Sequence, residues 1–210
     1  MNASMADLLD DLLQGGTLDQ ISTRIGADPA KTQLAIKEAL PVLLGGLERN
    51  AADPQGAESL QRALAEDQHA SILDDLDGYL SGQRQDRAAD GNGILDHILG
   101  DRRETAAQAL GQQAGLSGGN IMQLLAMLAP LVMGMLGKKS SGGSGGGGGF
   151  PDLGQILGQE RSQAQQKAPD MGDILGQVFG DGSSNASRSS SKREGGGLMD
   201  AITDMFGRKD

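Results

Sequence analysis

Residues that set backbone geometry recur in this chain 89 residues apart: Gly26 corresponds to Gly115, and Asp28 to Ser117. In each copy a glycine ends one helical pattern, a capping residue starts the next, and aliphatic residues then follow with helical spacing. Residues of these types build a packing unit and carry no catalytic chemistry. A helical unit with one apolar face cannot bury that face alone, so the sequence predicts two repeat units packed against each other.

The predicted fold class is all-α. It is an internally duplicated helical bundle, with repeat units at about 17–50 and 105–137, followed by a disordered Gly/Ser-rich tail. No segment alternates branched apolar and polar residues with a period of two, so no sheet is expected. Pro41 and Pro130 interrupt the long helical patterns and are expected to kink or split them. The second long pattern is apolar nearly all round, which predicts the central helix of the bundle.

Glycine and charge divide the chain near residue 137. Residues 1–137 hold 17 of the 34 glycines, and the shorter segment 138–210 holds the other 17. The first segment has 9 Lys or Arg against 19 Asp or Glu, whereas the second has 9 of each. We therefore expect an acidic α-helical domain over 1–137 and a flexible tail over 138–210. The net charge of -10 repels phosphate and anionic lipid, which excludes nucleic acid and disfavours membrane as partners.

The chain has no cysteine, which excludes disulfides and thiolate chemistry and is typical of a cytoplasmic protein. Acidic residues interrupt its first apolar segment, which lacks the pattern of a secretory signal. The longest apolar run, 121–136, is shorter than the about 20 residues of a membrane helix, so we expect it in the core. A membrane-peripheral or envelope-associated protein, attached through this helix, remains an alternative.

Three short amphipathic segments, the tail motifs, follow the glycine-rich stretch. The motif at 151–159 recurs 18 residues later at 169–177, and a looser copy lies at 198–207. Apolar anchors on flexible linkers are the layout of a multivalent ligand that enters apolar grooves, whereas the alternative is low-complexity drift. The candidate partner-binding residues are Ile156, Leu157, Ile174, Leu175, Phe179, Met205 and Phe206.

Four methionines in the second long pattern suggest an adaptable surface for these motifs. They are Met122, Met127, Met133 and Met135. The hypothesis is that the tail motifs dock on this methionine-rich face, within the same chain or on another copy. The expected partners are therefore proteins, self-association included, and no small-molecule substrate is evident.

Two histidines lie near carboxylates: His97 follows Asp96 and is a turn from Asp101, and His69 precedes further aspartates. A metal-dependent enzyme centred on His97 is therefore a second alternative. Neither histidine shows the spacing that places two ligands on one helical face. The preferred interpretation is a helix cap or a hydrogen bond between the repeat units. We predict no catalytic, cofactor-binding or metal-binding residue, and no enzyme.

Several segments resemble the bacterial domain of unknown function 937 (YidB-like) family. They are the Leu-Leu-Asp-Asp opening, residues 43–47, residues 93–103 and residues 131–136. The resemblance covers about residues 5–137 and implies an all-helical bundle with no established activity and no catalytic residues to carry over. The expected function is a protein–protein interaction or assembly module without catalysis or cofactors.

Overall fold

The computed structural model describes residues 4–14, 16–65, 70–83, 90–141, 153–168 and 171–180. Every regular element within these ranges is helical, so the all-α prediction is confirmed for them. They belong to a compact unit that extends to Phe179. The third tail motif with Met205 and Phe206, as well as His69, lies outside the described residues.

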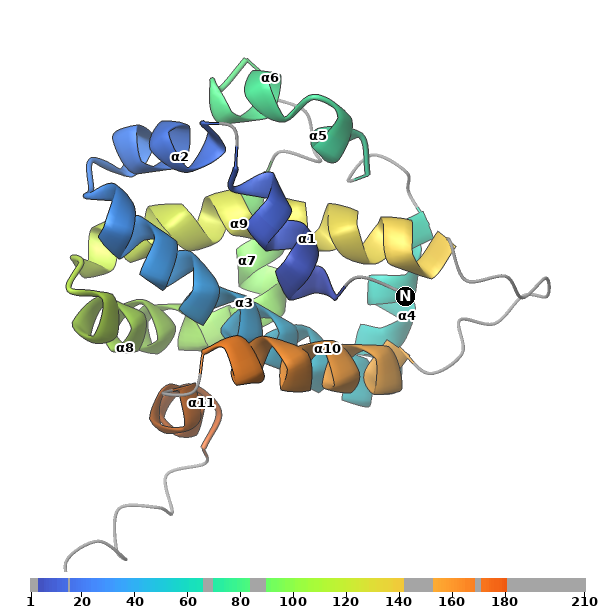
Figure 1. Cartoon of the computed structure of the whole chain (residues 1–210). Coiled ribbons are helices and arrows are strands. Elements are labelled where there is room, and N and C mark those ends of the chain that lie inside the picture. Colours follow the sequence, from blue (N-terminus) through green and yellow to red (C-terminus); the bar gives the residue numbers. More distant parts are fainter. Residues whose placement is uncertain are drawn as a thin grey trace, which may run out of the picture. The chain divides into compact units, whose positions relative to one another are not determined.

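Two long helices are surrounded by shorter ones (Figure 1). The long helices, α3 and α9, have 24 residues each and pack against each other. The helices in chain order are α1 (Met5–Leu12), α2 (Thr17–Ile25), α3 (Pro29–Ala52), α4 (Pro54–Ala65), α5 (Ala70–Asp74), α6 (Leu76–Leu80), α7 (Gly91–Leu99), the 3-10 turn η2 (Gly100–Arg102), α8 (Arg103–Ala114), α9 (Gly118–Ser141), α10 (Leu153–Lys167) and α11 (Met171–Phe179).

Local signals start the long helices where the sequence predicts. Gly26 and Gly115 end the preceding helices in left-handed conformations, with φ of 66° and 65°. Glycine adopts this conformation without steric cost. The Asp28 side chain then accepts hydrogen bonds from the first backbone N–H groups of α3, and the Ser117 hydroxyl accepts one from the backbone of Asn120 at 3.1 Å. As a result, α3 and α9 begin and end 89 residues apart.

The two internal prolines do not split the long helices. Pro41 lies within α3 and Pro130 within α9, and both helices are continuous. A proline inside a helix costs about 3 kcal/mol. Burying one leucine contributes about 1.5–3 kcal/mol, and α3 alone buries four, so the burial along each helix outweighs one proline.

The core forms where α3 and α9 meet, as the repeat predicts. Leu43 and Leu125 are both 0 % exposed and belong to one apolar cluster. Residues 118–139 of α9 are long and apolar enough to cross a membrane, with a mean hydropathy of 1.6, but 72 % of the most apolar window is buried inside the structure. This burial confirms the prediction of a core helix for the apolar run.

The folded part of the chain extends past the predicted boundary at residue 137. α10 and α11 lie in the segment predicted to be a flexible tail, yet they belong to the compact unit. Short glycine-bounded helices are marginal in isolation, which is why the sequence favoured a tail. Their apolar side chains are buried against earlier helices, and this burial offsets the entropy lost on ordering.

A docking face for the tail helices

The first tail helix packs along α3. We call α10 and α11 the tail helices and α1–α9 the body. α10 and α3 contact each other more extensively than any other pair of described helices (Figure 1). Leu157 is 0 % exposed and Ala164 2 %, whereas Gln155 and Gln159 on the opposite side are exposed. The predicted anchor Leu157 is therefore buried, and its neighbour Ile156 is half-buried against the core.

An ion pair accompanies this apolar contact. Arg161 Nη1 of α10 lies 2.8 Å from Glu48 Oε2 of α3, and the two side chains are 36 % and 30 % exposed. One turn earlier, Gly158 also faces Glu48, and an added Cβ would lie at an ordinary contact distance of 3.4 Å from its Oε1.

The second tail helix reaches the same side of α3. α11 packs on α8 and α3, and its Met171, Ile174 and Val178 are at most 5 % exposed. The Phe179 ring lies against Gly45, where an added Cβ would be 3.0 Å from ring atom Cε2. Arg49 donates a hydrogen bond of 3.2 Å to the Phe179 carbonyl at the end of α11. Gly45, Glu48 and Arg49 therefore form a docking face on α3.

The buried carboxylate of Glu160 joins α10 to the first and the last helix of the body. Glu160 is 4 % exposed and accepts a 2.7 Å hydrogen bond from the backbone N–H of Met5, at the start of α1. Lys139, near the end of α9, donates to its other carboxylate oxygen. A buried carboxylate is costly unless it is paired, and the N–H groups at a helix start lack partners within the helix. Glu160 therefore ties together α1, α9 and α10.

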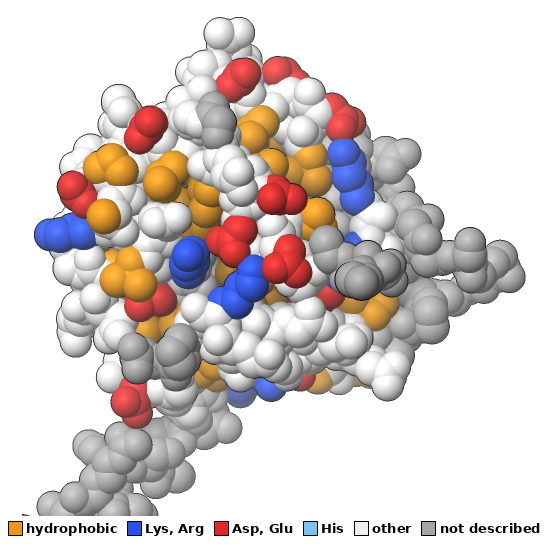
Figure 2. Space-filling view, viewed as in Figure 1, with side chains coloured by type: hydrophobic (Ala, Val, Ile, Leu, Met, Phe, Trp, Pro, Cys, Tyr) orange, Lys and Arg blue, Asp and Glu red, His pale blue; other side chains and the backbone are white. Residues whose placement is uncertain are grey.

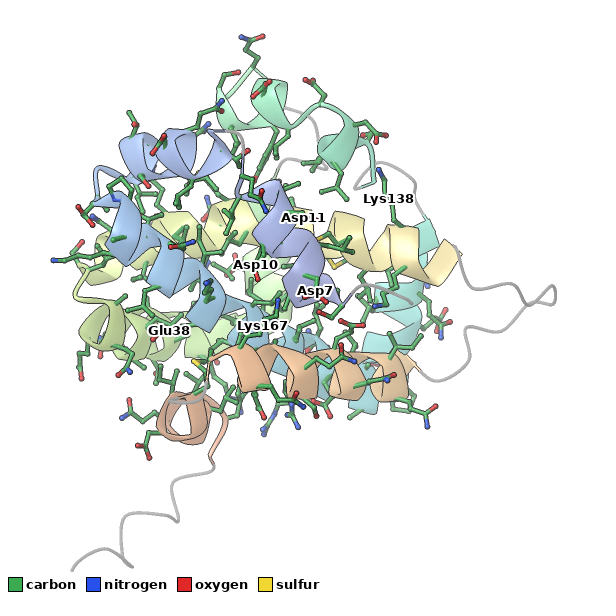
Figure 3. All side chains as sticks on the ribbon, in the orientation of Figure 1. Asp7, Asp10, Asp11, Glu38, Lys138 and Lys167 are labelled. Atoms are coloured by element: carbon green, nitrogen blue, oxygen red, sulfur yellow. The ribbon has the colours of Figure 1, made fainter. Side chains whose placement is uncertain are left out.

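A second charged cluster lies at the far end of α10. Lys167 reaches toward Asp7 and Asp10 of α1 and donates to them at 2.7 and 2.8 Å (Figure 3). Acidic and basic side chains lie next to each other on this face (Figure 2). The hydrogen bond from Lys167, with those from Ser4, lowers the pKa of Asp7, and the bonds to Asp10 and Asp7 raise the pKa of Lys167. These side chains are 39 to 53 % exposed, so they orient α10 more than they stabilise it.

The structure brings together five of the seven predicted partner-binding residues. They are Ile156, Leu157, Ile174, Leu175 and Phe179, all packed on the core of the body. The predicted docking surface is corrected, because the tail helices pack on α3, α1 and α8 and not on a methionine-rich face. Met127, Met133 and Met135 are at most 6 % exposed within the core, where α5, α7 and α8 cover α9.

The histidine that motivated the enzyme alternative has structural partners. His97 Nδ1 lies 2.7 Å from the Gly93 carbonyl, and the Asn50 side chain of α3 donates to the backbone carbonyl of His97. The neighbouring Asp96 pairs with Arg103 at 2.5 Å. Among the described residues, no group of three His, Asp or Glu is placed to hold a metal ion. The backbone of His97 therefore joins α7 to α3, whereas its side chain bonds within α7. Because α7 lies outside both predicted repeat units, this contact is not the expected hydrogen bond between the units.

Sequence reasoning missed the polar half of the interface. Nothing local in the sequence distinguishes Glu48, Glu160, Arg161 and Lys167 from solvated charges, because their partners are far away in sequence. One available signal was the likeness between residues 5–9, Met-Ala-Asp-Leu-Leu, and residues 171–175, Met-Gly-Asp-Ile-Leu. This likeness indicates that α11, a tail helix, and α1, a body helix, follow the same sequence pattern.

Comparison with protein families identifies the chain. The family described as "Bacterial protein of unknown function (DUF937)" matches residues 7–139 and, separately, residues 140–206. These matches span most of the chain, which therefore belongs to this family, as the resemblance in the sequence suggests. No curated protein and no solved structure matches the sequence.

Proposed function

We propose that this protein is a protein–protein interaction module without catalytic activity, in which the body is a receptor and the tail helices are its helical ligand. The observation that carries the proposal is the packing of α10 along α3, with Leu157 fully buried. Docking of an amphipathic helix on an apolar surface is a recurrent mode of peptide recognition. In this protein the ligand is part of the same chain.

The polar contacts between α10 and the body support the proposal, because contacts of this type contribute more to partner selection and register than to stability. Exposed ion pairs contribute about 0.2–1 kcal/mol each, yet charge complementarity selects partners and fixes register. α10 carries such contacts at Arg161 and Lys167, in addition to the buried ion pair of Glu160. A helix held only by apolar side chains could slide along α3, whereas these charges allow one register.

We further propose that the body consists of two copies of one helical unit. The equal lengths of α3 and α9, their internal prolines and the left-handed glycines before them support this duplication. In this view each long helix presents an apolar stripe, and the two stripes bury each other. The outer side of α3 is then free to accept a ligand.

The proposal is tested by cutting the connection between body and ligand. A protease site placed within residues 145–149 of the full chain allows cleavage after folding, with no docking residue altered. We expect the two fragments to elute together and α10 to keep its amide protection. Uncut protein with the same insertion is the control. Immediate separation of the fragments at micromolar concentration, with unchanged stability of the body, would contradict the proposal.

The absence of catalysis is tested separately through His97. Zinc or manganese is added to the wild type and to His97→Ala, and the melting temperature is followed. We expect no shift in either protein. Stabilisation of the wild type alone would favour the enzyme alternative, because a ligand that binds the native state raises its stability.

A further inference from the structure

We infer that the tail helices of one chain bind the docking face of a second copy when the chain concentration approaches the millimolar range or when docking within a chain is weakened, so that two chains exchange α10 and α11. The inference rests on the proposed function, because it requires α10 and α11 to behave as a ligand. It adds the identity of the partner, namely another molecule of this chain. The occupants of the docking face in the exchanged pair are α10 and α11 of that molecule.

The connection between body and ligand permits this exchange. Residues 142–152 join α9 to α10, and seven of these 11 residues are glycine. The polar groups that hold the tail helices, on Met5, Asp7, Glu48 and Lys139 among others, precede this linker. None of these contacts depends on which chain supplies the ligand.

The ligand resembles parts of its own receptor, which favours a second copy over an unrelated partner. The family matches residues 7–139 and 140–206 separately, and the division falls near the end of α9. In addition, α11 repeats the Met-x-Asp-x-Leu pattern of α1. Each of these two helices buries its methionine, with Met5 0 % and Met171 1 % exposed. The tail helices are thus elements of the family fold that dock on that fold.

Mass action sets how far exchange proceeds. A reciprocal pair of chains forms the same two interfaces as two closed chains, so the balance depends on the effective concentration of the tethered ligand. For elements joined by a short connection this concentration is in the millimolar range. The closed chain therefore predominates at micromolar concentration. Any change that weakens docking within a chain but not between chains shifts the balance to the exchanged pair.

Charge reversal at the Glu48–Arg161 pair makes such a change. Glu48→Arg and Arg161→Glu are made in separate full-length chains, and each variant then places like charges opposite each other when it closes on itself. In an exchanged heterodimer, Arg161 of the first variant meets Glu48 of the second, which is the native pair. At the other interface the two substituted residues meet and form the same pair with its charges reversed. A like-charge contact weakens docking by about tenfold. The heterodimer removes the like-charge contact at both of its interfaces. Its dissociation constant therefore falls about a hundredfold from the millimolar effective concentration, to tens of micromolar.

The measurement is native mass spectrometry on a 1:1 mixture of the two variants, warmed together at about 500 micromolar chain, roughly an order of magnitude above that constant. We expect a species of twice the 21.6 kDa chain mass in the mixture. Each variant alone remains a monomer. The double variant Glu48→Arg/Arg161→Glu, which restores the pair within one chain, also remains a monomer and regains the α10 protection of the wild type.

A second pair of charge-reversal variants covers the case in which a variant of the first pair misfolds. Asp10→Lys and Lys167→Asp reverse a contact whose side chains are both 39 % exposed, and the same mixing is applied. A heterodimer in either mixture supports exchange. If neither mixture contains one while α10 is protected in the wild type, exchange is refuted and intramolecular docking stands. If α10 is unprotected in the wild type as well, the proposed function itself fails.

Discussion

Replacement of Leu157 by alanine should release α10 from the body while leaving the body intact. Leu157 is 0 % exposed at the contact between α10 and α3. Truncation of a buried leucine to alanine costs about 2–5 kcal/mol, including the cavity that remains. Because α10 can settle toward α3, we take the lower part of this range, about 2–3 kcal/mol. This corresponds to a factor of about 30–150 in the docking equilibrium.

The change in helix propensity acts in the opposite direction to the loss of packing, so the two causes can be told apart. Alanine forms helices slightly better than leucine, so an intrinsic preference alone would strengthen α10. A loss of docking must therefore come from the lost packing. Gln155→Ala is the matched control, because Gln155 lies on the exposed side of the same helix and its replacement leaves the contact with α3 unchanged.

The assay is amide hydrogen exchange on the full chain. In Leu157→Ala we expect protection along α10 to fall by the same factor of about 30–150, while protection in the core of α9 stays at its wild-type value. Gln155→Ala should match or slightly exceed the wild type in α10 and match it in α9. Equal loss in the two variants would show that burial of Leu157 does not control the docking of α10. Loss of protection in α9 would show that α10 belongs to one cooperative core and is no ligand.

Three other expectations follow from single contacts. Gly158→Ala should raise α10 protection about fourfold, because helix propensity gains about 0.8 kcal/mol and the new Cβ lies at an ordinary 3.4 Å from Glu48; lower protection would refute that reasoning. The pKa of Asp7 is lowered from 3.8, so the unfolded chain binds more protons than the folded chain below about pH 4. The stability that Asp7 contributes is therefore present above that pH and is lost in stronger acid. Asp7→Asn should remove this part of the acid unfolding transition, as measured by circular dichroism. The buried Tyr79 hydroxyl donates to the Met127 carbonyl at 2.9 Å, and Tyr79→Phe should cost about 1 kcal/mol in urea unfolding, whereas an unchanged midpoint would count against this bond.

Helix positions could be predicted from sequence because short-range signals determine them. Asp53 illustrates this, since its side chain accepts hydrogen bonds from the backbone N–H groups of Gln55 and Gly56 at 2.9 and 3.0 Å, at the start of α4. Such caps involve neighbours two or three residues away and depend on residue type alone. The pairing of α3 with α9 was also predictable, because two amphipathic stripes in one acidic domain have few other ways to be buried.

The docking face was not predictable, because it depends on pairs far apart in sequence. Glu160 contacts Met5 across 155 positions, and Lys167 contacts Asp7 across 160. A charged residue near a glycine-rich stretch of sequence is by default expected to be solvated, and nothing local distinguishes Glu160 from its neighbours. Five of the seven predicted anchors lie in described helices and pack on the core of the body, but not on the surface that was expected. Methionine content suggested an open face on α9, whereas that helix is covered by other parts of the body.

The adjacent glycines of α3 separate the body from the ligand and allow a last test. A Cβ on Gly46 would lie 2.7 Å from the backbone carbonyl of Ile98 in α7, whereas one on Gly45 would meet only the edge of the Phe179 ring, at 3.0 Å. Backbone cannot yield as a ring can, so Gly46→Ala should overpack the body and lower its unfolding free energy by about 1–3 kcal/mol. Gly45→Ala gains helix propensity and displaces Phe179, so it should leave global unfolding unchanged or slightly strengthened while α11 loses amide protection. The same response from both variants would mean that α3 does not present two separate surfaces, and the division into receptor and ligand would then be wrong.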